Sequence, residues 1–340
     1  MNDQVRIHDR EPPRLRLANL PTPIVELPHL AGELGVNRVL MKRDDLTGIE
    51  LTGNKIRKLE YLLADAQSKG CDTLITHGGF QSNHCRATAA AGARAGMKVR
   101  LILRSPTATP NLVGNLLLDH LFGAEISLHT VEAYSNRRDQ LVGQAMDEAR
   151  AAGRRPYFFP VGGSVPVGSW GYVRCIHELL QQLPTGQPVD LYVAVSSSGT
   201  LAGLLLGKAL LSADNLRIVG VPVSDKLEQF RPDVMTIVEH SIAELRLPIR
   251  PESVELNLLD GFIGEGYAIP TPQSQAMLHR VARVEGILLD PTYTAKAMAG
   301  FVHAIETRQV RPGATPLFIH TGGVFGLMAR ADLFHQEVQG

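Results

Sequence analysis

Three positive side chains follow a turn-forming Gly53-Asn54 pair in the stretch "LTGNKIRKLEYLLADA": Lys55, Arg57 and Lys58. A helical pattern begins directly behind the turn, so all three charges fall in the first turn of the expected helix. An unprotonated lysine amine attacks carbonyl compounds, and partial burial beside other cations should lower its pKa toward that state. A solvated helix start is the usual alternative for such a cluster.

A second chemical signal lies in "AVSSSGTLAGLLLG", residues 194–207, where an apolar run enters a loop that opens a helical pattern. Unpaired N–H groups and the helix dipole favour an anion there. The spacing is neither G-x-x-x-x-G-K-[ST] nor G-x-G-x-x-G, which disfavours nucleotides and favours a single phosphate monoester. A serine-capped helix without a ligand explains the loop equally well. The candidate donors are Ser196, Ser197, Ser198 and Thr200, and Gly199 and Gly203 permit close approach.

Polar residues also follow the two glycines of "GGFQSNHCRATAAA", residues 78–91. Gln81, Ser82 and Asn83 could donate to a flat polar ligand, although capping the next helix is the commoner role of Ser or Asn. The pattern alone places His84 and Arg86 on the face of that helix. Further along the chain, Tyr267 and Tyr293 lie beside turn residues, and Thr321 ends an apolar run before two glycines. A tyrosine at a turn is more often a packing corner than a stacking face or a proton carrier.

The composition favours a globular enzyme. The 340 residues are 44% apolar and 20% charged with a formal net charge of zero, which gives no general attraction to nucleic acid or to an anionic membrane. No apolar run reaches the roughly 18 residues of a membrane span, and the polar N-terminal stretch has no signal-peptide core. We therefore expect a cytoplasmic protein. Three scattered cysteines and the absence of H-E-x-x-H and G-x-S-x-G disfavour a disulfide framework, a metal site and a serine hydrolase.

Short apolar runs alternate with helical patterns along most of the chain, which predicts parallel sheets with crossover helices. Ligands bind at the carboxyl ends of such strands, where this chain has Gly and Ser. A glycine-rich turn at 160–172 is the expected boundary between a small sheet and a larger one. The predicted strands are 38–45, 72–79, 99–104, 125–130, 155–163, 190–199, 217–224 and 316–323, and the predicted helices include 83–96, 111–123 and 136–152.

Pyridoxal 5'-phosphate needs an amine, a phosphate-binding loop and a partner for its ring nitrogen. This chain offers a lysine after a turn, a candidate phosphate loop and a hydroxyl close to the C-terminal end, which together match those needs. The motifs "LTGNKIRKLEYL", "GGFQSNHCRATA", "GTLAGL", "GILLDPTYTAKAMAG" and "FIHTGG" resemble, in order, those of the D-cysteine desulfhydrase and 1-aminocyclopropane-1-carboxylate deaminase family. The resemblance implies a two-domain α/β fold like tryptophan synthase β (PLP fold type II), each domain a largely parallel twisted sheet flanked by helices. It also implies a homodimer, a large domain of residues 1–57 plus 166–340, and a small domain of 58–165, with the active site between them.

Carried over to this chain, the resemblance makes Lys55 the Schiff-base lysine and gives Lys58 a contact with the cofactor phosphate. The α-proton would be taken by Lys55 or Ser82. The implied cofactor-binding set is Lys55, Lys58, Asn83 at the 3-hydroxyl, Ser197, Ser198, Gly199 and Thr200 at the phosphate, and Thr321 or Thr294 at the ring nitrogen. The implied substrate-binding set is Gln81, Ser82, Asn83, His84, Tyr267 and Tyr293, of which Ser82, Tyr267 and Tyr293 would join Lys55 in catalysis.

Within this family, Thr294 after the second tyrosine and the sequence "QSNHC" resemble desulfhydrases more than deaminases, which typically carry Glu and "QSNQT" there. We therefore expect α,β-elimination of D-cysteine, through an aldimine at Lys55, to pyruvate, ammonia and sulfide. Ser196 and Ser198 replace small residues of the family pattern, and Ala295 replaces Gly. These departures leave room for another β-substituted substrate, such as a cysteate, a cysteine S-conjugate or chloroalanine.

Two further functions stay open on the sequence. The first is a 1-aminocyclopropane-1-carboxylate deaminase, which would give 2-oxobutyrate and ammonia. The second is a catalytically dead protein that binds a phosphate ligand, and Lys55 argues against it, because a binding module needs no reactive amine.

Overall fold

The computed structural model describes residues 10–334, and within them two sheets carry the fold. The larger sheet has the order β1-β2-β10-β7-β8-β9, in which β1 runs antiparallel to β2 and the other neighbours are parallel. The smaller sheet has the order β5-β4-β3-β6, with every pair parallel. This architecture confirms the predicted fold class.

The strands of the larger sheet are β1 (Ile24–Glu26), β2 (Leu40–Lys42), β7 (Val189–Val195), β8 (Leu216–Pro222), β9 (Asn257–Leu258) and β10 (Thr315–Ile319). Those of the smaller sheet are β3 (Thr73–Gly79), β4 (Lys98–Ser105), β5 (Glu125–Thr130) and β6 (Pro156–Phe158). The helices are α1 (Pro28–Glu33), α2 (Lys55–Ser68), α3 (Asn83–Arg94), α4 (Gly114–Leu121), α5 (Val131–Ala151), α6 (Pro166–Gln182), α7 (Gly199–Leu210), α8 (Leu227–Glu244), α9 (Pro272–Glu285), α10 (Thr294–Glu306) and α11 (Val324–Met328).

Every strand predicted from the apolar runs is present, although several are shorter than predicted. The stretch 155–163 ends as a strand at Phe158, because the turn at Val161–Gly163 follows with Gly162 at a φ of 73°. The stretch 190–199 ends at Val195, because α7 begins at Gly199. The short strands β1 and β9 were not predicted, since two or three residues carry too little pattern to be recognised.

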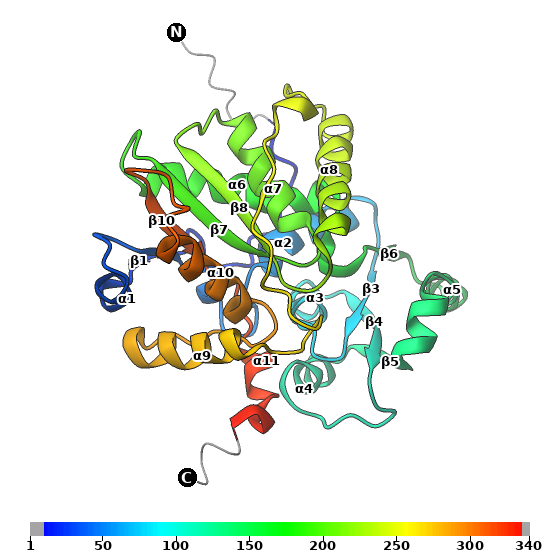
Figure 1. Cartoon of the computed structure of the whole chain (residues 1–340). Coiled ribbons are helices and arrows are strands. Elements are labelled where there is room, and N and C mark those ends of the chain that lie inside the picture. The colour runs from blue at the N-terminus through cyan, green and yellow to red at the C-terminus, as the bar shows by residue number, and fades with distance from the viewer. Residues whose placement is uncertain (1–9, 335–340) are drawn as a thin grey trace.

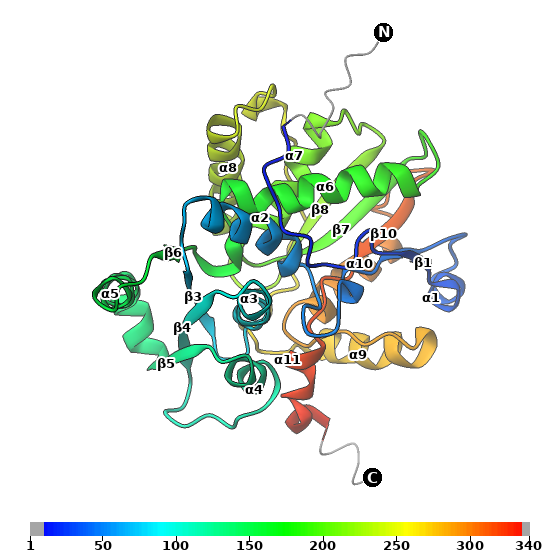
Figure 2. The same cartoon turned by 180° about the vertical axis from the view of Figure 1, so that it is seen from behind.

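Helices cover both faces of each sheet (Figures 1 and 2). In the larger sheet, Leu191 and Val193 pack with α6 and α7, and the intervening Tyr192 packs with α10 on the other face. In the smaller sheet, Leu101 joins the cluster beside α3, and Ile102 joins the cluster beside α5. Strands buried on both faces are typical of parallel sheets, which explains their continuous apolar runs.

Helix α2 joins the two halves of the molecule. Its first turn packs against α6, where a Cβ on Gly171 would lie 2.4 Å from the Arg57 carbonyl oxygen, so only glycine permits the approach. Helix α6 also packs against α7, so the start of α2 and the start of α7 share one rigid support. The predicted limits between residues 57 and 58 and between 165 and 166 stay a prediction, and α2 runs unbroken through the first of them.

Candidate active site

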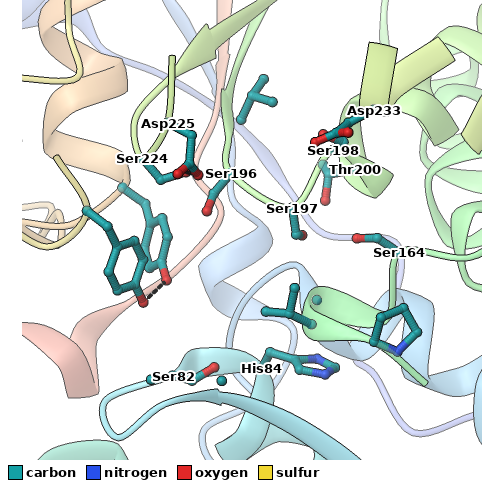
Figure 3. Close-up of a pocket in the computed structure, with 18 of the residues that line it drawn as sticks. Ser82, His84, Ser164, Ser196, Ser197, Ser198, Thr200, Ser224, Asp225 and Asp233 are labelled. Carbon is teal, nitrogen blue, oxygen red and sulfur yellow. Dashed lines mark hydrogen bonds between the residues drawn. The ribbon is translucent and has the colours of Figure 1, made fainter. Parts of the chain in front are cut away.

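A cavity of about 590 Å³ lies where the carboxyl ends of strands from both sheets meet. Figure 3 shows residues of the Ser196–Thr200 loop on one side of it, and Ser82 and His84 across from them. Of the residues predicted from the sequence, Lys55, Ser82, Asn83, His84, Ser197, Ser198, Thr200, Tyr267, Tyr293 and Thr321 line this cavity. Gln81, Lys58, Gly199 and Thr294 are not among the described residues that line it.

Lys55 is the first residue of α2, and the turn before it is tied to two other parts of the site. Gly53 has a φ of 103°, and a Cβ there would lie 2.8 Å from the Thr321 carbonyl oxygen. That same oxygen accepts a hydrogen bond from the Asn54 N–H at 3.1 Å, and Asn54 Nδ2 donates to Thr200 Oγ1 at 3.0 Å. The "LTGNK" motif therefore sets Lys55 against both the β10 end and the α7 loop.

Burial lowers the pKa of Lys55 from 10.5 to about 8, and the nearby Asp290 carboxylate partly opposes this change. At pH 7 such a group is a free amine in roughly one molecule in ten, whereas an ordinary lysine is almost never one. The predicted lowering of the pKa is confirmed, and of the two causes predicted for it only burial acts. Burial produces it, rather than repulsion by the two neighbouring cations.

Arg57 points away from Lys55 into a buried ion network. Its Nη2 lies 2.8 Å from Asp44 Oδ1, and its Nη1 lies 2.9 Å from Glu178 Oε1. Burial alone would lower the pKa of Arg57, but these carboxylates raise it well above its ordinary value. Arg57 therefore stays charged and neutralised, and it stabilises the helix rather than the site.

Lys58 lies one turn beyond Lys55 and is fully buried behind the cavity wall. Its Nζ donates to the Gly162 carbonyl at 2.8 Å and to Ser164 Oγ at 3.4 Å. Burial, followed by the charge of Lys55, lowers the pKa of Lys58 well below 10.5. Lys58 therefore holds the 162–164 turn, of which Gly162 and Ser164 line the cavity. Its predicted contact with the phosphate stays a prediction.

The loop from β7 to α7 is built for an anion. Ser198 has a φ of 63°, a conformation uncommon for any residue but glycine, and its buried Oγ has no hydrogen-bond partner among residues 10–334. The Ser197 and Thr200 hydroxyls also line the cavity, and Gly199 is buried as the first residue of α7. The first N–H groups of α7 lack intrahelical acceptors. A buried hydroxyl without a partner at a helix N-terminus fits a phosphate group.

Ser82 and Asn83 begin α3 on the other side of the cavity. Ser82 Oγ accepts from the Cys85 N–H at 3.3 Å, so the helix-capping role is real, and the side chain also lines the cavity. Asn83 lines the cavity while its Oδ1 accepts from Asn115 Nδ2 at 3.0 Å. Gln81 turns away, since its Nε2 donates to the Val113 carbonyl and its Oε1 accepts from the Asn115 N–H.

His84 faces the cavity as a neutral imidazole. Thr76 Oγ1 uses its only hydrogen to donate to the Phe159 carbonyl at 2.8 Å, so His84 Nε2, 2.9 Å away, donates to that hydroxyl. The other ring nitrogen, Nδ1, is buried without a partner among residues 10–334. Burial, and then the charges of Lys55 and Lys58, lower the pKa of His84 well below 6.5. The site thus has a buried acceptor that the sequence pattern did not distinguish from a helix-face residue.

Two tyrosines close another wall of the cavity. The hydroxyls of Tyr267 and Tyr293 lie 2.7 Å apart, and burial raises the pKa of both. Thr294 does not face the cavity, because its Oγ1 donates to Asp290 Oδ1 at 2.7 Å. Of the two candidate partners for a ring nitrogen, Thr321 is therefore the one that reaches the cavity.

Several residues in or near the cavity were missed by sequence reasoning. Asp290 acts electrostatically on Lys55 and accepts hydrogen bonds from the backbone of residues 292–294. Its place three residues before the tyrosine in "DPTYTAK" was the available signal. The other missed residues come from elements without any recognisable motif, so only the tertiary structure brings them together. They include Arg104, Ser164, Ser224, Asp225 and Asp233.

Comparison with known proteins agrees with this site. Residues 15–322 match the family model described as pyridoxal-phosphate dependent enzyme. The chain is 39% identical to the D-cysteine desulfhydrase of Salmonella typhi over 93% of this chain and 96% of that protein, and 38% identical to that of Klebsiella pneumoniae over the same shares. A solved structure of an ACC deaminase homologue superimposes with a TM-score of 0.89 at 35% identity, covering 99% of both chains.

The chain belongs to the pyridoxal-phosphate dependent enzymes, as its motifs predicted, and pyridoxal phosphate is its cofactor. Within that family it belongs with the D-cysteine desulfhydrases and their ACC deaminase homologue. A structure of O-ureido-L-serine synthase, at 16% identity and a TM-score of 0.68, shares the fold alone. No helix among residues 10–334 is long and apolar enough to cross a membrane.

Proposed function

We propose that this enzyme is a lyase that eliminates the thiol of D-cysteine and releases pyruvate, ammonia and sulfide. One observation carries the proposal. A partly buried lysine with a pKa of about 8 faces the same cavity as the Ser197–Thr200 loop, in a chain whose relatives at 39% identity are D-cysteine desulfhydrases. A binding protein would not need that amine.

The cavity offers a complementary group for each part of the cofactor. Lys55 would bind its aldehyde carbon covalently, and the loop of Ser197, Ser198, Gly199 and Thr200 would hold its phosphate. Thr321 would face the ring nitrogen, and Asn83 the 3-hydroxyl. Thr321 and Thr200 are both connected to the turn at Asn54 through the hydrogen bonds described above, which supports one coordinated placement of these groups.

The chain's own residues would then move one proton and orient the substrate. The bound cofactor supplies an electron sink for the substrate α-carbon. Lys55, once displaced by the substrate amine, is the proposed acceptor of the α-proton, with Ser82 as the alternative acceptor or the partner of the substrate carboxylate. The C–S bond breaks with its electron pair on sulfur, and water completes the release of pyruvate and ammonia. Tyr267 and Tyr293 would flank the substrate and exclude water.

The test combines a chemical label with product assays on the purified holoenzyme. Borohydride reduction followed by peptide mapping should fix the cofactor on Lys55 and on no other residue. Sulfide and pyruvate should form in equal amounts from D-cysteine. A label on another lysine would overturn the assignment of the site, and a labelled Lys55 without sulfide would overturn the choice of substrate.

The structural likeness to an ACC deaminase homologue favours one second candidate. The same enzyme should therefore be assayed with 1-aminocyclopropane-1-carboxylate, from which a deaminase forms 2-oxobutyrate. We expect no 2-oxobutyrate, because Thr294 stands where such deaminases carry Glu. Formation of 2-oxobutyrate at a rate comparable to that of sulfide would reverse this choice.

We also propose a cytoplasmic homodimer with domains of 1–57 plus 166–340 and of 58–165. The two separate sheets support the division, since all strands of the smaller one lie between Thr73 and Phe158. Light scattering should give twice the chain mass. Limited proteolysis should cut in the connection near residues 160–165 before it cuts either sheet, and cleavage inside β3 or β4 at an equal rate would contradict the division.

A further inference from the structure

An arginine without a carboxylate partner stands in the cavity wall. Arg104 lies near the carboxyl end of β4, opposite Gly79 of β3, and lines the cavity. Its backbone carbonyl accepts from the Phe80 N–H at 2.9 Å, which places it beside the turn that leads to Ser82. The guanidinium has no ion pair and no side-chain hydrogen bond with any residue between 10 and 334. Its five N–H donors are thus available to a ligand.

Two aromatic rings hold this guanidinium in place. Its central carbon lies 5.1 Å from the ring centroid of Tyr267 and 5.6 Å from that of Tyr134. Such contacts position a cation while leaving its charge unneutralised and its edge free to donate. Tyr267 also bonds Tyr293 and lies 3.6 Å from where a Cβ on Gly79 would be. The positive charge is therefore held at the wall where the substrate is proposed to bind.

Other charged groups of the cavity do not cancel it. Arg138, a second positive side chain that lines the cavity, is half exposed, and its Nε pairs with Asp139. The carboxylates of Asp225 and Asp233 lie with the Ser196–Thr200 loop, across the pocket from Ser82 (Figure 3). The part of the cavity next to Ser82 thus has a net positive charge. A substrate with a neutral side chain would not need that charge.

We propose that Arg104 forms a subsite for a negatively charged β-substituent of the substrate, such as a sulfonate. The inference rests on the proposed elimination and extends it to a class of substrates. A planar guanidinium donates two parallel N–H groups to an oxyanion such as a sulfonate. When the C–S bond breaks, both electrons go to sulfur and the α-proton goes to Lys55. A sulfonate then departs as sulfite and a thiol as hydrosulfide, and Arg104 binds the charge that the sulfonate already carries before the bond breaks.

The kinetic test compares a charged with an uncharged β-substituent in the holoenzyme. D-Cysteate carries an anionic sulfonate on its β-carbon, and β-chloro-D-alanine carries an uncharged chlorine there. Arg104→Gln should lower kcat/KM for D-cysteate by about ten- to a hundredfold, the range for a lost charge-assisted hydrogen bond, and for β-chloro-D-alanine by less than about threefold. Arg104→Lys should recover part of the loss, since it keeps the charge.

The matched control is Arg100→Gln on the same strand, because Arg100 pairs with Glu148 outside the cavity. The Arg100→Gln substitution should change kcat/KM for neither substrate. An equal loss on both substrates in Arg104→Gln would mean that the guanidinium binds the α-carboxylate, and no loss on either would mean that it only packs between the tyrosines. Each of these results overturns the proposal, as does a wild-type enzyme that neither converts nor binds D-cysteate.

A binding measurement separates this inference from the proposed function. Calorimetry with 3-sulfopropanoate, which has no amine and cannot react with the cofactor, should show binding that weakens at least about tenfold in Arg104→Gln. The uncharged isostere 3-(methylsulfonyl)propanoate should bind equally weakly to both proteins. If no β-substituted alanine is converted but this difference appears, the lyase proposal fails and the anionic subsite stands. If both analogues bind alike, the subsite fails whatever the activity.

Discussion

Positive side chains on the two faces of helix α2 have opposite electrostatic environments. On one face Arg57 is surrounded by the carboxylates of Asp44 and Glu178, which keep it charged at any pH the protein meets. On the other face Lys58 is buried and Lys55 partly buried, both with little compensating charge, and desolvation lowers the pKa of both. Burial is common to all three residues, so the pairing decides whether a charge supports the fold or becomes a reactive amine.

The largest effect is expected from Lys55→Ala, which tests whether this face of α2 carries the reactive amine. We expect pyruvate formation to fall by about a thousandfold or more, because both the cofactor attachment and a proton acceptor are lost. The free energy of unfolding should not decrease, since an uncompensated buried amine is removed. The control is Lys69→Ala, an exposed lysine behind the same helix that should keep full activity. A Lys55→Ala enzyme with a tenth of wild-type turnover would refute the catalytic assignment.

The opposite result is expected for Arg57→Met. Its loss leaves Asp44 and Glu178 buried without their main partner, and breaking such a pair costs about 3–5 kcal/mol. Urea unfolding should show that decrease, while the activity per folded molecule stays near the wild-type value. A loss below about 1 kcal/mol would mean that Lys42, which lies 3.2 Å from Glu178, already compensates the network.

The pH dependence of cofactor loading tests the pKa of Lys55 directly. Only the unprotonated amine reacts with the aldehyde, so the rate should rise about tenfold per pH unit below the pKa and level off above it. The bend should fall near pH 8, whereas an ordinary lysine would give a rise up to pH 10.5. In Asp290→Asn the bend should move to lower pH, because the Asp290 charge raises the pKa of Lys55. A bend that moves upward would contradict this arrangement.

The smallest effect is expected from Lys58→Met. Since its Nζ reaches the Gly162 carbonyl rather than the cavity, only one or two hydrogen bonds to the 162–164 turn are lost. The dissociation constant of pyridoxal phosphate should therefore rise by less than about tenfold, as measured by fluorescence titration. A rise of a hundredfold would instead support the direct phosphate contact that the family resemblance implied.

The local sequence pattern by itself determined much of the fold, the family and the cofactor. Apolar runs located eight of the ten strands in the described part of the chain, because strands buried on both faces must be apolar throughout. The glycine before Lys55 and the serines before α7 were recognised because a positive φ and an anion-binding helix start each demand particular residue types. The family and its cofactor followed from these motifs taken together.

Only the tertiary structure decided which side chains meet. Charge and spacing alone do not distinguish Lys55, Arg57 and Lys58. The packing of α2 against α6 sends one to the cavity, one to an ion network and one behind the wall. Arg104 lies in a strand without any recognisable motif, and its place beside Tyr267 arises from elements more than 150 residues apart. Charges and pKa values depend on distance and burial in space, and a linear pattern holds neither quantity.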